Sequence, residues 1–315
     1  MPEKHLFIVD PVEKFDPHHD TTYVIMREVE AAGAETWSCG SEDLVFTDGK
    51  LEARVKKIST HRSGEFKHFK KLDEARSRLD RFDLIWMRED PPFDSQYLYA
   101  TYLLEQACPP VINNPRGIRD SNEKLFIFEF PDLIPPTWVG ASKSSARRFI
   151  DECGGEVVAK SLSGYGGEEV FRVSAGGGSF EKIYNQLSSA GRQSFILQKF
   201  LPEVLKTGDR RLILLGGEPV GGLTRIPQPG DFRANLHSGG TAEDVYLSEK
   251  EKEICRQLKP ELLQRGLHLV GVDLVEDLIT EINVTSPTCV QEINRLGNLK
   301  LEEKIVNYAR RQLIA

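Results

Sequence analysis

The stretch VGVDLVEDLITEINVT at residues 270–285 decides how the last third of the chain folds. Two runs rich in β-branched residues flank a polar break at 276–278, a pattern that predicts an antiparallel hairpin. We expect a loop of three residues, which would place Val275 opposite Ile279. Because successive side chains of a strand point to opposite faces, the length of this loop decides which polar residues share a face.

With a loop of that length, Asp273 lies opposite Glu281, and Asn283 projects from the same face. Two carboxylates and an amide oxygen are hard ligands that suit Mg²⁺, which also takes waters and substrate phosphates. A two-residue turn would instead move Asp273 to the other face. An ordinary solvated sheet face, which holds acids without any metal, is the alternative.

Length and composition favour an ordinary globular protein of two or three domains. The chain has 315 residues, of which 28% are charged, and its formal net charge of −7 argues against a general nucleic-acid binder. Its five cysteines form no CxxC pair, which fits reduced thiols better than disulfides or a zinc site. No apolar run approaches the roughly 18 residues of a membrane span, and no signal-peptide pattern precedes the first strand. We therefore expect a cytoplasmic protein that does not act at a membrane.

The first third of the chain alternates between strand and helix patterns. We expect strands at 5–9, 84–88 and 111–112 and helices at 21–32 and 95–106. Such alternation favours a parallel sheet of the nucleotide-fold type. No GxGxxG motif follows the first strand, so a dinucleotide site has little support.

Beyond about residue 120 the pattern changes to strands separated by glycine-rich segments. In KSLSGYGG, residues 160–167, the glycines lie between two strands, so this is not a P-loop. Glycine lets backbone N–H groups wrap an anion, and Lys160 supplies a compact positive charge. A hairpin turn with an exposed lysine is the alternative, and Lys124 on its own is an ordinary surface lysine.

Four arginines bracket a hairpin at 211–225 and the long loop at 226–242: Arg210, Arg211, Arg225 and Arg233. Loops longer than about 12–15 residues are usually functional lids or disordered. Arg233, in the middle of this loop, could be delivered to a charged transition state when the loop closes. A surface loop whose arginine has no role is the alternative.

The order of these parts resembles the ATP-grasp superfamily and, over essentially the whole length, the bacterial glutathione synthetases. The segments that carry the resemblance are MREDPPFD (87–94), YATY (99–102), RDSNEKL (119–125), RIPQ (225–228) and TEINVTSPTC (280–289). It implies a mixed α/β ATP-grasp fold preceded by a Rossmann-like parallel-sheet domain. The implied parts are an N-terminal domain (1–122), a lid subdomain (123–200) and a catalytic subdomain (201–315) with a mobile loop at 226–242.

The resemblance also implies roles for individual residues. Those implied to contact ATP are Lys124, Lys160, Gly164, Gly166, Gly167, Gln198, Lys199, Phe200, Leu201 and Asp209. The implied metal ligands are Asp273, Glu281 and Asn283. Phosphate and substrate carboxylates would be bound by Arg210, Arg225 and Arg233. The γ-glutamyl end of the substrate would lie at Asp20, Thr21 and Thr22, and the acceptor glycine at Ser286.

The implied reaction is the ATP-dependent ligation of γ-glutamylcysteine to glycine through an acyl phosphate. It implies two Mg²⁺ ions, for which Mn²⁺ could substitute, and a homo-oligomer, a tetramer by resemblance. A carboxylate–amine ligase with another acceptor or donor is one alternative. A regulatory protein that binds nucleotide without turnover is another, and the full set of charged site residues argues against it.

Overall fold

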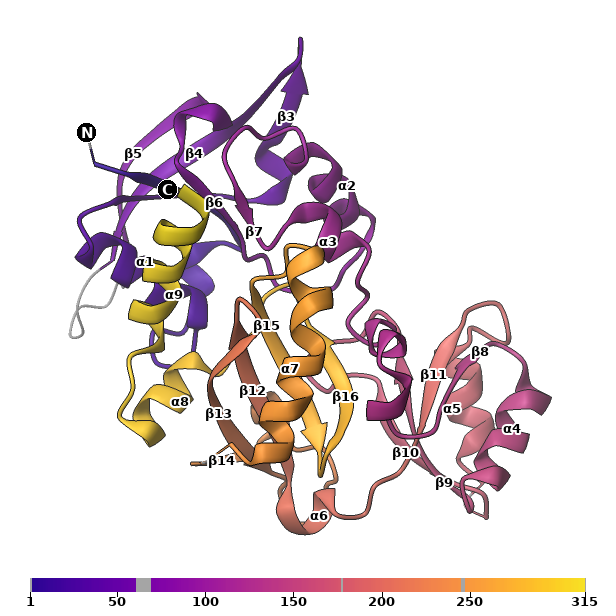
Figure 1. Cartoon of the computed structure of the whole chain (residues 1–315). Coiled ribbons are helices and arrows are strands. Elements are labelled where there is room, and N and C mark those ends of the chain that lie inside the picture. The colour runs from indigo at the N-terminus through magenta and orange to yellow at the C-terminus, as the bar shows by residue number, and fades with distance from the viewer. Residues whose placement is uncertain (1, 61–68, 177, 245–246, 315) are drawn as a thin grey trace.

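A computed structural model of the chain describes residues 2–60, 69–176, 178–244 and 247–314. Within these ranges the strands form three sheets of 7, 4 and 5 strands, which follow one another along the chain and share no strand. Figure 1 shows the first sheet at the top, the third in the middle and the second at the lower right. None of the helices in the described ranges is long and apolar enough to cross a membrane.

The first sheet has the strand order β3-β4-β2-β1-β6-β7, with β5 paired to β4. Its strands are β1 (Lys4–Ile8), β2 (Glu35–Cys39), β3 (Leu44–Thr47), β4 (Lys50–Thr60), β5 (Phe69–Arg78), β6 (Leu84–Met87) and β7 (Val111–Ile112). The four strands β2-β1-β6-β7 are parallel, as the alternating pattern predicts. The helices of this part are α1 (Thr21–Ala31), α2 (Ser95–Leu104) and α3 (Pro115–Arg119).

The antiparallel extension β3-β4-β5 is not among the elements predicted from the sequence. In β4 the buried residues Leu51, Ala53 and Val55 alternate with charged ones, but the pattern is short. β5 is exposed along nearly all of its length and has no apolar periodicity. Its pairing therefore depends on backbone hydrogen bonds to β4, which leave little trace in the sequence.

The second sheet is antiparallel, with the order β10-β9-β11-β8. Its strands are β8 (Thr137–Gly140), β9 (Glu156–Ser161), β10 (Val170–Ser174) and β11 (Phe195–Lys199). Helices α4 (Lys143–Glu152) and α5 (Phe180–Leu187) pack their apolar faces on it and form a separate hydrophobic cluster. The segment 160–167 connects the antiparallel neighbours β9 and β10, as predicted.

The third sheet has the order β14-β13-β12-β15-β16 and is antiparallel. Its strands are β12 (Asp209–Leu215), β13 (Glu218–Ile226), β14 (Thr241–Asp244), β15 (Leu269–Val275) and β16 (Leu278–Asn283). The helices of this part are α6 (Val204–Thr207), α7 (Glu249–Gln264), α8 (Val290–Gly297) and α9 (Leu301–Ala309). In Figure 1, α9 returns to the first sheet and lies beside α1.

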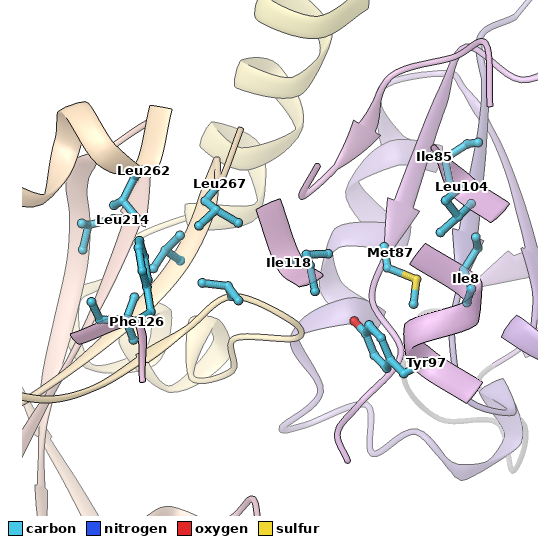
Figure 2. Close-up of a cluster of buried hydrophobic side chains, with 14 of the residues drawn as sticks. Ile8, Ile85, Met87, Tyr97, Leu104, Ile118, Phe126, Leu214, Leu262 and Leu267 are labelled. Atoms are coloured by element: carbon cyan, nitrogen blue, oxygen red, sulfur yellow. The ribbon is translucent and has the colours of Figure 1, made fainter. Parts of the chain in front are cut away.

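One hydrophobic cluster extends from the first sheet to the third. Figure 2 shows Met87 and Tyr97 on the side of the first sheet and Leu214 and Leu262 on the side of the third. Asn113, buried at the end of β7, adds four hydrogen bonds across the same junction. Its Nδ2 donates to the carbonyls of Leu269 and Val284 at 2.8 and 2.7 Å, and its Oδ1 accepts from the N–H groups of His268 and Leu269. The first sheet is thus joined to both strands of the 270–285 hairpin.

Candidate functional site

A two-residue turn joins β15 and β16, so the predicted three-residue loop is wrong. Val275 pairs with Leu278 and not with Ile279. Glu276, the first turn residue, has a φ of 55°, the left-handed conformation that a tight hairpin turn needs. Glu-Asp is not one of the dipeptides that signal such a turn, which is why the sequence pointed to a longer loop.

A β-bulge nevertheless restores the predicted alignment of the polar residues. The register shifts between Leu274 and Asp273, so that Thr280 is the extra residue on β16. Asp273 consequently lies opposite Glu281, as predicted, in spite of the even-length turn. Asn283 Nδ2 lies 3.5 Å from Asp273 Oδ2, which places all three candidate ligands on one face.

That face borders a cavity of about 950 Å³. The cavity is lined by residues from all three sheets and their loops, and every site residue predicted from the sequence lines it except Arg210. Arg210 and Arg211 are neighbours on β12 and point to opposite sides. Arg210 pairs with Glu251 of α7 at 3.1 Å, whereas Arg211 lines the cavity. Sequence reasoning gave Arg211 no role, because alternation alone does not say which face of a strand meets the cavity.

Arg211 belongs to a buried network of alternating charges. Its Nε and Nη2 donate to the two carboxylate oxygens of Asp273 at 2.5 and 2.9 Å. Arg225 Nη2 lies 3.1 Å from the same carboxylate, and Arg225 also binds Asp209 through two hydrogen bonds of 2.6 Å. Burial alone would raise the pKa of Asp273, but Arg211 and Arg225 hold it well below its usual range. Asp273 is therefore ionised at neutral pH.

Two lysines come close to the same hairpin. Lys124 Nζ lies 3.6 Å from Glu281 Oε1 and donates to the carbonyl of Gly164. Lys160 Nζ donates to Gln198 Oε1 at 2.7 Å, and burial lowers the pKa of Lys160. Lys124, which the sequence alone would leave at the surface, is only 5% exposed. The cavity therefore has a cationic wall next to the acidic hairpin.

The glycine segment and the loop at 226–242 are in contact. Gly167 has a φ of 85°, and a Cβ there would lie 2.6 Å from Ser238 Oγ and 2.9 Å from Asn235 Nδ2. Only glycine fits this position without displacing the loop. Arg233 pairs with Asp231 at 2.8 Å and donates to the carbonyl of Gly167 at 3.4 Å. The loop thus covers the cavity in this structure.

An apolar wall borders the cavity near the end of β11. Phe200 packs with Val204 and Val275, and Leu201 and Phe232 complete the cluster. Phe200, Leu201 and Val204 belong to the chain segment between the second and third sheets, Val275 to the hairpin strand β15, and Phe232 to the loop at 226–242. Such a wall can bury the apolar area of a flat aromatic ligand.

Glu123 is a half-buried residue of the cavity wall to which sequence reasoning gave no role. It accepts hydrogen bonds from the N–H groups of Val284 and Thr285 at 3.0 and 3.2 Å, and from Thr285 Oγ1 at 2.7 Å. Burial raises the pKa of Glu123. By holding the chain directly after β16, Glu123 fixes the end of the strand that carries Glu281 and Asn283.

Another part of the cavity wall is formed by the starts of α1 and α8. Thr21 Oγ1 accepts from the N–H of Val290 at 3.3 Å, and Gln291 Nε2 donates to the carbonyl of Asp20 at 2.6 Å. Asp20 also caps α1, because its Oδ1 accepts from the N–H of Tyr23 at 3.0 Å. The structure therefore brings the residues after the first strand against the segment that follows the hairpin.

Arg88 lies between these two segments and is 3% exposed. Its Nε donates to Thr22 Oγ1 and its Nη2 to the carbonyl of Pro287, both at 3.1 Å. Its Nη1 is buried and finds no hydrogen-bond partner among the described residues. Ser286 Oγ donates to the carbonyl of Arg88 at 3.4 Å. The place of Arg88 in the sequence could have indicated a role in the site, because Arg88 follows a parallel strand at the sheet edge where α/β folds bind ligands.

The residues at the hairpin fit a hard divalent cation in part. No group of three or more His, Cys, Asp or Glu side chains in the described part of the chain could hold a metal ion. The candidate set instead has two carboxylates and one amide, and Asp273 is already bound by two guanidinium groups. Such a set suits Mg²⁺, which takes one or two carboxylates and completes its shell with waters and phosphates.

Comparison with known proteins identifies the family. The model of the prokaryotic glutathione synthetase N-terminal domain matches residues 4–119, and that of the ATP-grasp domain matches residues 123–298. The chain is 37% identical to a glutathione synthetase of Synechocystis sp., over 98% of this chain and 99% of the relative. It is 38% identical to a glutathione synthetase of Agrobacterium fabrum, over 92% of this chain and 90% of the relative.

Solved structures support the fold. The D-cycloserine synthetase DcsG matches with a TM-score of 0.70 and 15% identity, over 98% of this chain and 99% of that one. A RimK domain ATP-grasp protein from Sphaerobacter thermophilus matches with a TM-score of 0.63 and 13% identity, over 97% and 98% of the two chains. The fold is that of the ATP-grasp proteins, and the chain belongs to the prokaryotic glutathione synthetase family.

Proposed function

We propose that this protein joins γ-glutamylcysteine to glycine at the expense of ATP, forming glutathione, ADP and phosphate. One observation supports the proposal most directly: the acidic face of the hairpin and the lysines and arginines beside it line the same cavity of about 950 Å³. Membership of the glutathione synthetase family supplies the substrates. A regulatory protein that only binds nucleotide would have no need for this complete set of charges.

The chemistry needs positioning and charge neutralisation more than a side-chain nucleophile. We assign the phosphates of ATP to Lys124, Lys160, Arg211 and Arg225, which surround the hairpin. Their charges attract the nucleotide and favour the negative charge that develops on the transferred phosphoryl group. Lys160 is half-buried and desolvation lowers its pKa, so phosphate binding would favour its charged form.

Asp273, Glu281 and Asn283 would hold Mg²⁺, which when bound neutralises phosphate charge; two ions are expected, and Mn²⁺ would substitute. The apolar wall at Phe200 and Leu201 would take the adenine, with Asp209 near the ribose. Gln198 and Lys199 precede this wall on β11 and complete the adenine segment. Gly164, Gly166 and Gly167 would cover the phosphates.

The reaction would proceed in two steps. A carboxylate oxygen of γ-glutamylcysteine attacks the γ-phosphorus of ATP, a P–O bond forms, and ADP leaves. The amine of glycine then attacks the acyl carbonyl, the C–O bond to phosphate breaks, and the amine loses a proton. Contact between Arg233 and Gly167 closes the cavity and would keep water from the acyl phosphate. Ser286 is our candidate contact for glycine.

The decisive test measures phosphate release with purified protein, ATP, Mg²⁺, γ-glutamylcysteine and glycine. We expect release that requires both substrates and a product that is glutathione by mass. A panel of other amino acids in place of glycine tests for a ligase with a different acceptor. Equal or faster release with another acceptor would overturn the assignment of glycine. Glu281→Ala, with Glu249→Gln on the exposed start of α7 as a matched control, should nearly abolish turnover while the fold is retained.

Three further expectations from the sequence extend this proposal. The chain would divide into parts at 1–122, 123–200 and 201–315, which agrees with the three separate sheets. A homo-oligomer, by resemblance a tetramer, would be its assembly. A cytoplasmic location would suit its five cysteines, all of which are free.

A further inference from the structure

The strand β16 carries two of the three candidate metal ligands, although it is the outermost strand of the third sheet. Among the described strands it pairs only with β15, so the hydrogen-bonding groups on its other edge need partners from outside the sheet. An edge strand that lacks such partners opens locally more easily than a central one. The alignment of Glu281 and Asn283 therefore depends on the residues that hold this outer edge.

One residue, Glu123, holds the outer edge on both sides of Asn283. Its main-chain carbonyl accepts a hydrogen bond from the N–H of Ile282 at 3.0 Å. Its carboxylate oxygen Oε1 accepts from the N–H of Val284 at 3.0 Å and from the N–H and Oγ1 of Thr285 at 3.2 and 2.7 Å. The main chain and the side chain of Glu123 thus take the place that a neighbouring strand would have beside Asn283.

The residue after Glu123 connects the same segment to the glycine segment. Lys124 Nζ lies 3.6 Å from Glu281 Oε1 and donates to the carbonyl of Gly164. Two consecutive residues therefore contact the strand of the metal ligands, and one of them also contacts the glycine segment. Because both contacts start from one short piece of chain, a displacement of β16 away from Glu123 would also change the distance between Glu281 and Lys124.

Building on the proposed function, which places a divalent cation at the hairpin, we propose that Glu123 is a positioning residue for the metal site. It acts through β16, because its hold on the outer edge keeps Glu281 and Asn283 aligned with Asp273. Removal of a residue that orients metal ligands typically lowers metal affinity by about 10- to 100-fold. Lys160 and the apolar wall lie on other elements, so the loss of Glu123 should weaken metal binding far more than nucleotide binding.

Binding of Mn²⁺ at saturating ADP, followed by electron paramagnetic resonance without any turnover, tests the proposal. We expect Glu123→Ala to raise the Kd for Mn²⁺ by about 10- to 100-fold. The Kd for ADP, measured by calorimetry in EDTA, should stay within about threefold of the parent value. Glu123→Gln should keep the Kd for Mn²⁺ within about threefold of the parent, because its amide oxygen accepts the same hydrogen bonds.

Glu30→Ala is the matched control. Glu30 accepts hydrogen bonds from the N–H and Oγ1 of Thr60, as Glu123 does from Thr285, and neither Glu30 nor Thr60 lines the cavity. The Kd for Mn²⁺ of this variant should equal that of the parent. A melting temperature within about 3 °C of the parent shows that each variant is folded.

The outcomes separate this proposal from the proposed function. If the parent protein makes no glutathione, the proposed function fails, whereas the Mn²⁺ measurement still tests Glu123. A parent protein that binds no Mn²⁺ with ADP overturns both the metal assignment and the role of Glu123. An unchanged Kd for Mn²⁺ in Glu123→Ala, or an equal loss of ADP affinity in EDTA, overturns the positioning role.

Equal losses of Mn²⁺ affinity in Glu123→Ala and Glu123→Gln overturn it as well, because the charge and not the hold on the strand would then set the affinity. If Glu123→Ala does not fold, Thr285→Val takes its place, since it removes only the hydroxyl donor. The Kd for Mn²⁺ of Thr285→Val should rise by about 3- to 10-fold, and an unchanged Kd overturns the proposal.

Discussion

Replacing Asp20 by asparagine should stabilise the folded protein at neutral pH. Burial raises the pKa of Asp20 to about 6 from its usual 3.8. Between these values the folded state keeps a proton that the unfolded state releases, so stability is lost as the pH rises from about 4 to 6. Asparagine has no such charge. It also keeps the N-cap of α1, because its amide oxygen accepts the Tyr23 hydrogen bond as well as a carboxylate does.

The size of the effect follows from the pKa difference. At pH 8 the buried charge costs at most about 3 kcal/mol, and at pH 5 about half of that. We therefore expect Asp20→Asn to be more stable by up to about 3 kcal/mol at pH 8 and by about 1.5 kcal/mol at pH 5.

Urea denaturation at several pH values between 5 and 8 measures this difference. The free energies of unfolding of the parent and Asp20→Asn should diverge by roughly 1.5 kcal/mol across this range. The same variant should bind γ-glutamylcysteine less tightly, as a KM assay would show. A stability difference that does not change with pH would refute the reasoning, because it would mean that Asp20 titrates alike in the folded and unfolded states.

Three further predictions concern the cavity and the junction of the sheets. Arg211→Lys should lower kcat/KM at least 10-fold, because lysine lacks the two donors with which the guanidinium holds both oxygens of Asp273. Arg210→Lys should stay within about threefold of the parent. Steady-state kinetics with varied ATP compares the two variants, and equal losses would contradict the placement of Arg211 in the cavity. Arg233→Ala should lower kcat more than it changes KM for ATP, because Arg233 joins the loop at 226–242 to the glycine segment beside the cavity. Steady-state kinetics measures both constants, and an unchanged kcat would remove the loop from the mechanism. Asn113→Ala should lower the free energy of unfolding by roughly 2–4 kcal/mol, because four backbone groups lose their hydrogen-bond partner. Urea denaturation measures this change, and a loss below about 1 kcal/mol would show that the junction between the sheets relaxes.

The hairpin shows both how far sequence reasoning reaches and where it stops. Alternation along β15 and β16 predicts that Asp273 and Glu281 share a face, and they do. The reason given for it, a three-residue loop, is wrong: a two-residue turn and a bulge at Thr280 reach the same pairing. A bulge inserts one residue without any strong composition signal, so an alternating pattern does not reveal it.

The missed residues were missed for a different reason. Arg211, Glu123 and Glu292 are ordinary charged residues in the sequence, and only the fold makes them notable, because it buries Arg211 and Glu292 and binds Glu123 to the chain after β16. Glu123 acts on Thr285, which is 162 positions away in the chain. Contacts of this range depend on how the sheets pack together. The strand β5 was missed because nearly all of its residues are exposed, so the sequence has no alternation of apolar and polar residues there.

The bulge at Thr280 has a consequence for protein engineering. It lies between the polar face of the hairpin and the turn at Glu276 and Asp277, so the two-residue turn and the bulge together set the alignment of Asp273 with Glu281. The turn can therefore change its sequence at constant length: replacement of Glu276-Asp277 by Asn-Gly, the dipeptide that favours such a turn, would leave the register of the polar face unchanged.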